Sequence, residues 1–167
     1  RDGLIDHLGH VRSALLCHRH QVFRLHQSSF HRFPYGLLNE FNGQTGKGDI
    51  VMLILKRRWQ YWVCTLALQK LGAISIPATA QLTKKDIIYR NNAASIKMIV
   101  SVAEPEIVSF VEASMEESPT VVCKALVGGN REGWFDFDAE LDAASDHWER
   151  PCGKDAAGGY DIMLMYF

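Results

Sequence analysis

The chain has 167 residues, of which 47% are apolar and 22% charged, and its formal net charge at pH 7 is −1. A chain of this size can bury one ordinary hydrophobic core, and its near-neutral charge gives no electrostatic reason to expect nucleic acid or an anionic membrane as a partner. No apolar run approaches the roughly 20 residues that span a bilayer, and the start shows no apolar secretion signal. We therefore expect one globular domain without a membrane span.

The cysteines of the chain are far apart in the sequence and form no C-x-x-C motif. Two of them lie within apolar runs, where a small buried thiol is expected. Cysteine zinc sites require cysteines at closer, recurring spacings. The sequence therefore favours a reducing compartment, and we expect a cytoplasmic protein. The four residues are Cys17, Cys64, Cys123 and Cys152.

Residues 1–45 differ in composition from the rest of the chain. Six of the seven histidines fall there together with five arginines and no lysine, whereas lysines occur only from Lys47 onward. A zinc site near Cys17 and His18 is disfavoured, because zinc needs four converging ligands at a spacing that does not recur here. We interpret 1–45 as an atypical His/Arg-rich segment, poorly ordered, which is either translated out of frame up to about Asn42 or a divergent tail. The six histidines are His7, His10, His18, His20, His26 and His31.

Residues 46–80 have the pattern of a strand, a helix and a second strand. Residues 50–55 are an unbroken apolar run between charged residues, as a buried parallel strand requires. In residues 59–71 apolar side chains recur every three to four positions, which predicts an amphipathic helix that ends near Gly72, and residues 73–76 then form a strand. The stripe expected to face the sheet contains Trp59, Trp62, Val63, Leu66, Ala67 and Leu71.

The remaining elements continue the alternation of strands and helices. Thr83 and Asp86 have the spacing of a capping box and start a helix over residues 84–92. Pro105 fits the first turn of another helix. Such an order predicts the α/β class, with a mostly parallel sheet and helices on both faces. Further strands are expected at 97–102, 121–127 and 162–167, with a short aromatic segment at 134–137 and a helix at 138–144.

Two local constellations suggest phosphate or nucleic-acid chemistry without establishing it. Residues 56–62 mix three cations with aromatic residues, as a nucleic-acid surface would. Because Trp59 and Trp62 fall on the predicted sheet-facing stripe, a solvated loop followed by core residues is the favoured interpretation. Gly128 and Gly129 follow a strand, where a turn is more common than a phosphate nest, and no complete phosphate-loop motif occurs in the chain.

Several phrases of the sequence occur together in one known family. GKGDIVMLILKRR, LGAISIPAT and LTKKDIIYRNN follow one another at characteristic spacing, and the chain closes on DIMLMYF. In this order they resemble the N-terminal domain of the adenylate-forming (AMP-binding) acyl-CoA synthetases, most closely the acetyl/medium-chain branch. The resemblance covers residues 46–167 and implies an incomplete N-terminal domain, since the family's phosphate loop comes directly after the phrase that resembles DIMLMYF.

The resemblance implies a function for the parent protein rather than for this chain. A short- or medium-chain carboxylate and ATP, with Mg²⁺, would give an acyl-adenylate, which the thiol of coenzyme A would convert to a thioester. The phrase from Pro77 to Gln81 matches one in medium-chain synthetases whose glutamine is associated with coenzyme A, so Gln81 is the candidate cofactor-binding residue. The family's catalytic and metal-binding groups match no residue here, so we expect the fragment to be inactive and to bind no cofactor tightly.

Two alternatives stay open at this stage. Gln81 could be an ordinary loop glutamine, because side-chain amides commonly bond to loop backbone. The whole chain could be a free-standing α/β interaction or regulatory domain without an active site. The nucleotide sequence downstream of the coding region distinguishes these, since a reading of S-G-T-T-G-x-P-K in frame supports the synthetase.

Deleting residues 1–42 is expected to leave the thermal midpoint within about two degrees of that of the full chain, because residues foreign to a fold contribute little to its stability. Thermal unfolding followed by circular dichroism measures the difference. A large loss of stability on deletion would show that the segment is structural.

Overall fold

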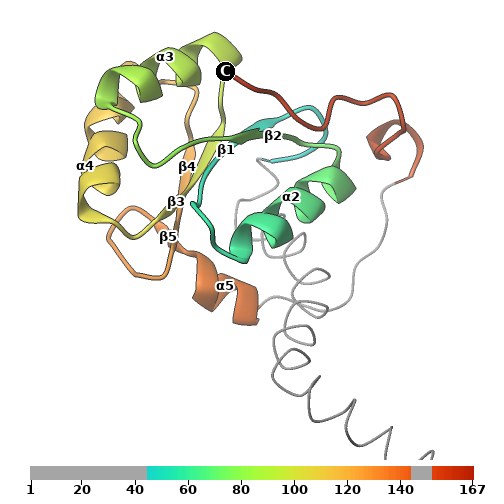
Figure 1. The fold of residues 1–167 in the computed structure, drawn as a ribbon. Helices are drawn as coiled ribbons and strands as arrows, with labels where there is room; N and C mark the ends of the chain where they lie inside the picture. Colours follow the sequence, from blue (N-terminus) through green and yellow to red (C-terminus); the bar gives the residue numbers. More distant parts are fainter. Residues whose placement is uncertain (1–44, 144–151) are drawn as a thin grey trace, which may run out of the picture.

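The computed structural model describes residues 45–143 and 152–167 (Figure 1). Within them one sheet has the strand order β2-β1-β3-β4-β5, and every pair of neighbouring strands runs parallel. The predicted α/β class with a mostly parallel sheet is therefore confirmed. The strands are β1 (Ile50–Ile54), β2 (Ile74–Pro77), β3 (Met98–Val102), β4 (Cys123–Val127) and β5 (Phe135–Asp136).

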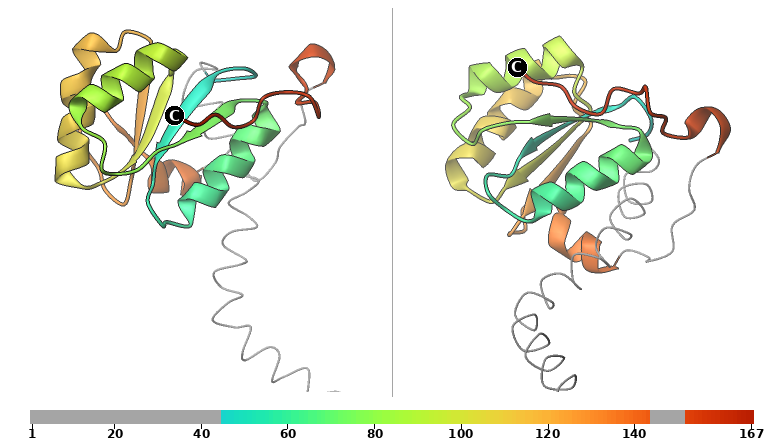
Figure 2. Two further views of the ribbon diagram at one scale, coloured as in Figure 1. Left: turned by 45° about the horizontal axis from the view of Figure 1, so that its top comes forward. Right: turned by 45° about the vertical axis from the view of Figure 1, so that its right-hand side comes forward.

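Helices cover both faces of this sheet, as predicted. Figures 1 and 2 show α2 and α5 on one face and α3 and α4 on the other. Parallel strands need such crossover helices to return the chain to the starting edge of the sheet. The helices are α2 (Gln60–Leu71), α3 (Lys84–Ala94), α4 (Pro105–Ser114) and α5 (Phe137–Ala143), with short 3₁₀ turns η1 (Met115–Glu117) and η2 (Gly153–Asp155).

The core lies around β1 and β3, which pair with each other and have a neighbouring strand on both sides. Residues 51–55 are at most 1% exposed, and all five residues of β3 are buried. β1 pairs with β2 on one side, with Leu53 opposite Pro77, and with β3 on the other, with Leu53 opposite Val100. An apolar run buried on both faces is what the unbroken hydrophobic pattern indicated.

Three predicted helix boundaries are confirmed by the residues at the helix ends. Thr83 and Asp86 form the capping box, in which the Thr83 backbone N–H donates to Asp86 Oδ2 at 2.9 Å and the Asp86 backbone N–H donates to Thr83 Oγ1 at 3.5 Å. Gly72 closes α2 in the left-handed conformation, with φ 73°. Pro105 occupies the first turn of α4.

The predicted sheet-facing stripe of α2 is partly wrong. Trp59, Trp62 and Leu66 are 38%, 65% and 41% exposed, so these three side chains face away from the core. Val63, Ala67 and Leu71 are buried as expected. The buried face is rotated by about one residue, because Gln60, Cys64 and Leu68, which the apolar pattern passed over, also face inward.

The two outermost segments also differ from expectation. Residues 162–167 do not form the predicted strand, since only Leu164 makes an isolated parallel bridge, with Ser75 of β2. Conversely, Phe135 and Asp136 form the short strand β5 at the opposite edge. Edge segments pair with a strand on one side alone. They are short, so the sequence shows no long apolar or alternating run that would mark them.

The atypical segment 1–45 lies outside the described residues apart from Thr45, as do Cys17 and the histidines of the zinc interpretation. The boundary at residue 46 stays a prediction. Among the described residues, no helix has the length and apolar character needed to cross a membrane.

The rotation of α2 can be tested with one substitution at two positions. Leu68→Asp should lower the free energy of unfolding by about 4 kcal/mol, because Leu68 is 1% exposed and a carboxylate there would be buried without a partner. Leu66→Asp on the same helix should cost less than about 1 kcal/mol, because its side chain reaches solvent. Urea denaturation of both variants gives the comparison. A larger loss for Leu66→Asp than for Leu68→Asp would mean that the helix faces the sheet as the sequence pattern predicted.

Candidate functional site

The candidate site is the edge of the sheet at which the parallel strands end. The chain goes from β1 to β2 on one side and then, through α3, to β3 on the other side of β1. The helices that follow β1 and β3 therefore lie on opposite faces, which makes the boundary between these two strands a topological switch point. Open α/β sheets bind their ligands at the carboxyl ends of the strands at such a point.

Gln81 lies in the loop that follows β2 at this edge. The Ala78 backbone N–H donates to the Leu53 carbonyl at 2.9 Å, which carries the parallel pairing with β1 into the loop. The Gln81 backbone N–H donates to Thr79 Oγ1 at 3.2 Å. Its side chain is exposed and its amide makes no hydrogen bond to a described residue, whereas Leu82 beside it is buried. The loop is thus fixed at Ala78 before Gln81 and at Leu82 after it, while the Gln81 side chain is exposed to solvent.

An ion pair connects the loops after β1 and β3. Lys56 Nζ donates to both oxygens of the Glu104 carboxylate, at 2.6 Å to Oε1. Both side chains are about half exposed, so water screens the attraction. Lys56 has φ 50°, in the left-handed region that residues with a Cβ rarely adopt. This backbone turn directs the chain away from β1 and places the ammonium group over the end of β3.

A second set of contacts joins α2, β4 and α5. The Gly128 backbone N–H donates to Asp138 Oδ2 at 2.7 Å, and Gln60 Nε2 donates to Asp138 Oδ1 at 3.1 Å. The Asp138 carboxylate thus takes an N–H that a phosphate nest at Gly128 and Gly129 would need to offer. Gly129 is closely packed, since a Cβ there would lie 2.8 Å from the Cβ of Ala103. These contacts support the favoured interpretation of the two glycines as a turn.

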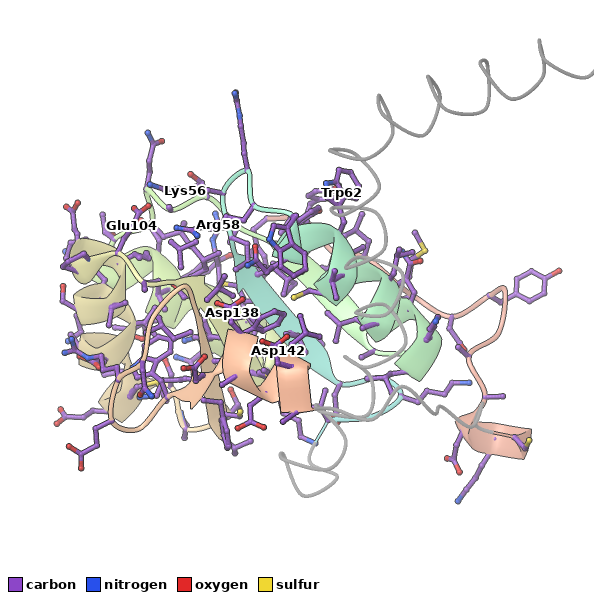
Figure 3. All side chains as sticks on the ribbon, turned by 90° about the horizontal axis from the view of Figure 1, so that it is seen from below. Lys56, Arg58, Trp62, Glu104, Asp138 and Asp142 are labelled. Atoms are coloured by element: carbon purple, nitrogen blue, oxygen red, sulfur yellow. The ribbon has the colours of Figure 1, made fainter. Side chains whose placement is uncertain are left out.

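Figure 3 looks onto this edge of the sheet and shows Lys56, Arg58 and Glu104 gathered there, with Asp138 on the neighbouring α5. The Arg58 guanidinium lies over the end of β4, where a Cβ on Gly128 would be 3.2 Å from Nη1. Gly128 has φ 79°, so a side chain there would be strained, and its Cβ would crowd the Arg58 guanidinium. Gln60 Oε1 is buried and has no hydrogen-bond partner among the residues that the structure describes.

Cys64 of α2 and Cys123 at the amino end of β4 are not activated nucleophiles, and the described residues form no metal site. Burial raises the pKa of Cys123 to about 12 and the pKa of Cys64 well above its ordinary value, so both thiols stay protonated at neutral pH. Hydrogen bonds from Thr83 hold the pKa of Asp86 below its usual range. Among the described residues, no group of three or more His, Cys, Asp or Glu side chains is arranged to hold a metal ion.

The loop between β4 and β5 is held from the side by α4. Arg131 forms two hydrogen bonds to the Glu112 carboxylate, from Nε at 2.6 Å and from Nη2 at 2.8 Å. Trp134 Nε1 donates to the same carboxylate at 3.0 Å, and Lys124 lies over the Trp134 ring at 5.1 Å from its centroid. The side-chain hydrogen bond from Arg131 is the main reason that the pKa of Glu112 lies below its ordinary value.

Solved structures with this arrangement include CoA ligases. The anthranilate CoA ligase AuaEII in complex with anthranoyl-AMP matches 83% of the chain with a TM-score of 0.69 and 18% identity, and the chain covers 26% of that protein. The N-terminal domain of FACL13 from Mycobacterium tuberculosis matches 81% with a TM-score of 0.64 and 17% identity, and 31% of that chain is covered. The fold is therefore part of the N-terminal domain of this class of ligase.

Sequence comparison identifies the family. The family described as AMP-binding enzyme matches residues 35–166, and the chain belongs to it. Acyl-coenzyme A synthetase ACSM4, mitochondrial, of Rattus norvegicus is 36% identical over 122 residues, which are 72% of this chain and 20% of the relative. For ACSM1, mitochondrial, of Mus musculus the identity is 38% over 103 residues, or 60% and 18%. The chain thus spans about a fifth of the length of the curated relatives it matches.

The sequence located one residue of this edge, Gln81, and missed the contacts around it. Lys56 was expected only as a charged residue beside the strand at 50–55 and Glu104 was not singled out, because their pairing spans 48 positions in the chain. The missing signal was positional, because both directly follow strands that a parallel sheet places side by side. The pairing of Gln60 with Asp138, 78 positions apart, carries no such signal.

Glu112→Gln should destabilise the protein by about 1 kcal/mol at pH 7, because it weakens charge-assisted hydrogen bonds that are partly screened by solvent. The pKa of Glu112 is lowered from 4.5 in the folded protein, so its contribution is complete above that value and is lost as the pH falls through the folded pKa. The stability difference from wild type should therefore shrink below about pH 4.5. Denaturation from pH 7 to 3 measures this. Glu116→Gln, on an exposed side chain nearby, is the control and should have little effect at any pH.

Proposed function

We propose that this chain is part of an AMP-forming acyl-CoA synthetase that acts on short- or medium-chain carboxylic acids. The observation that carries the proposal is the family match over residues 35–166 together with relatives named acyl-coenzyme A synthetase at 34–38% identity. The substrates of the parent protein would be a small carboxylate, ATP and coenzyme A. The AuaEII structure, with its acyl-AMP, supports an acyl-adenylate as the intermediate of such ligases.

In the first half of the proposed reaction, a carboxylate oxygen attacks the α-phosphorus of ATP and pyrophosphate leaves. In the second, the thiol sulfur of coenzyme A attacks the acyl carbon, AMP leaves and the thiol proton passes to solvent or a base. Both steps depend on positioning and on stabilising developing negative charge. Mg²⁺ would neutralise phosphate charge in the parent, but the described residues do not fit a metal site, and we assign no step of this chain to it.

The role proposed for this chain is to supply scaffold and one contact to coenzyme A. Gln81 stands exposed at the carboxyl edge, in a loop whose position is fixed by the buried Leu82 and by the capping box that follows. Because the Gln81 side-chain amide makes no hydrogen bond within its own loop, it can donate a hydrogen bond to a ligand and accept one from it. We assign no catalytic residue to this chain, and we expect the 167-residue fragment to be inactive and to bind ATP and coenzyme A weakly.

The alternative from another class is a free-standing α/β interaction domain without an active site. The exposed side chains of Trp62 and Leu66 on α2 favour the interaction domain, because exposed apolar side chains can mark the binding site of a partner. The two proposals differ in what happens when the chain is extended. Only the synthetase predicts carboxylate-dependent activity in the product of the extended reading frame.

For location, we propose a reducing compartment. The scattered cysteines favour the cytoplasm, and the names of the relatives also make the mitochondrion a candidate. Imaging of the parent protein fused to a fluorescent protein decides between the two.

The 167-residue chain should catalyse neither carboxylate-dependent exchange of pyrophosphate into ATP nor thioester formation with acetate, butyrate or octanoate, whereas the parent protein should do both. In the parent, Gln81→Ala should raise the KM for coenzyme A by about fivefold to tenfold and leave pyrophosphate exchange nearly unchanged, because the contact is used only in the second half-reaction. Gln69→Ala on α2 is the matched control. Pyrophosphate exchange by the 167-residue chain would show that the chain itself contains catalytic residues. An unchanged KM for coenzyme A in Gln81→Ala would show that Gln81 is an ordinary loop residue.

A further inference from the structure

Residues 161–167 lie along β2 with little sheet pairing. Leu164 makes one parallel bridge to Ser75, whose backbone N–H donates to the Met163 carbonyl at 3.1 Å and whose carbonyl accepts from the Met165 N–H at 3.0 Å. A segment that runs parallel with the strands leads the chain toward their carboxyl ends, where open α/β sheets bind ligands. Beyond Met165 the described residues make no further backbone hydrogen bond to the sheet, so other contacts set where the segment ends.

Two side chains of α3 hold the ring of Phe167. The Arg90 guanidinium lies over the ring, 5.5 Å from its centroid, and the Tyr89 ring meets it edge to face, with centroids 5.9 Å apart and an interplanar angle of 78°. Both contacts are attractive, because an aromatic ring has a negative face and a positive edge. In Figures 1 and 2 the end of the chain accordingly lies beside α3.

The contacts of Phe167 fix a segment rather than the fold. Phe167 and Tyr89 are 47% and 66% exposed, so neither ring belongs to the core. A contact between half-exposed rings removes little apolar surface from water, and its main effect is to restrict the conformations of the chain that it joins. Loss of the contact should therefore free the end of the segment and leave the sheet and helices folded.

The position of Arg90 follows from the capping box at the start of α3. Thr83 and Asp86 fix where the helix begins, and Arg90 lies one turn beyond Asp86 on the same face. The pKa of Asp86 is lowered chiefly by the Thr83 side chain and also by the positive charge of Arg90. Gln81 directly precedes this box, so one helix sets both the Gln81 loop and the two residues that hold Phe167.

We propose that Arg90 and Tyr89 are positioning residues for the synthetase reaction, because by holding Phe167 against α3 they fix the direction in which the parent chain continues. This role rests on the proposed function, in which the parent is longer than this chain. Neither residue needs to touch a substrate. Without them the backbone that leads to the ligand-binding edge would sample several directions, so a smaller fraction of molecules would hold the reacting groups in the productive geometry.

Amide hydrogen exchange in the 167-residue chain tests these contacts without any assumption about catalysis. Arg90→Gln and Tyr89→Ala should each speed exchange of the Met165 amide about threefold to tenfold, because either change makes local opening of the segment easier. The amides of β1 should keep their exchange rates, and circular dichroism should show the same folded state. Tyr89→Phe keeps the ring, so it should exchange as wild type does.

Two matched controls separate the contacts from general effects of charge and aromatic area. Lys85→Gln removes an exposed cation from α3 and Tyr160→Ala removes an exposed ring, so both should leave Met165 exchange within about twofold of wild type. In a Phe167→Leu background Arg90→Gln should have almost no further effect, because its partner ring is gone. Unchanged exchange in Arg90→Gln and Tyr89→Ala, or equal acceleration in the controls, would overturn the inference.

In the parent protein a positioning role predicts a split between two kinetic constants. Arg90→Gln should lower kcat for thioester formation about tenfold and leave the KM for coenzyme A within about twofold, because the Gln81 loop is unchanged. Arg90→Lys should recover most of the rate, because an ammonium can also lie over an aromatic ring. The rates are expressed per folded molecule, so that a merely structural role, which would lower only the amount of folded enzyme, leaves kcat unchanged.

The failures of this role and of the proposed function are distinguishable. A wild-type parent without carboxylate-dependent pyrophosphate exchange would refute the proposed function and with it the positioning role. An active parent in which Arg90→Gln keeps the wild-type kcat, or in which that variant raises only the KM for coenzyme A, would refute the positioning role alone.

Discussion

The fold depends on the burial of β1 between two parallel neighbours. Its apolar residues contact helices on both faces of the sheet, and an ion pair closes the β1/β3 pair at each end. At the amino end Lys97 binds Asp49 at 2.9 Å, and at the carboxyl end Lys56 binds Glu104. In each case one residue borders β1 and the other borders β3, so charges just outside the apolar run favour one register of the pair.

The elements that the sequence predicted correctly are those with strong local signals. The buried strands have unbroken apolar runs, and α3 begins at a capping box that can be read from Thr83 and Asp86 alone. The inward face of α2 had no such signal. Gln60 is buried because its amide reaches Asp138 on a distant helix, and Trp62 is exposed although it is apolar, so periodicity alone placed the face one residue away.

The candidate site was predictable only where a motif marked it. Gln81 was found from the phrase around it, and its contact with coenzyme A stays a prediction. The cations at 56–58 were noticed but set aside, because the tryptophans beside them were expected to be buried. The exposure of Trp62 removes that reason, and the clustering of Lys56, Arg58 and Glu104 follows from strand order, which no local pattern specifies.

The single bridge between Leu164 and Ser75 gives this fold a part that can open by itself. The backbone N–H of Ser75 donates to Met163 at 3.1 Å and that of Met165 to Ser75 at 3.0 Å, whereas Lys47 with Asp161 and the ring of Phe167 against Tyr89 hold the segment at its two ends. Few contacts mean a low free energy of local opening, so these amides would exchange with solvent long before those of β1. Among the described residues β2 is the outer strand on this side, so each opening would expose its edge, and an exposed sheet edge can pair with another extended chain.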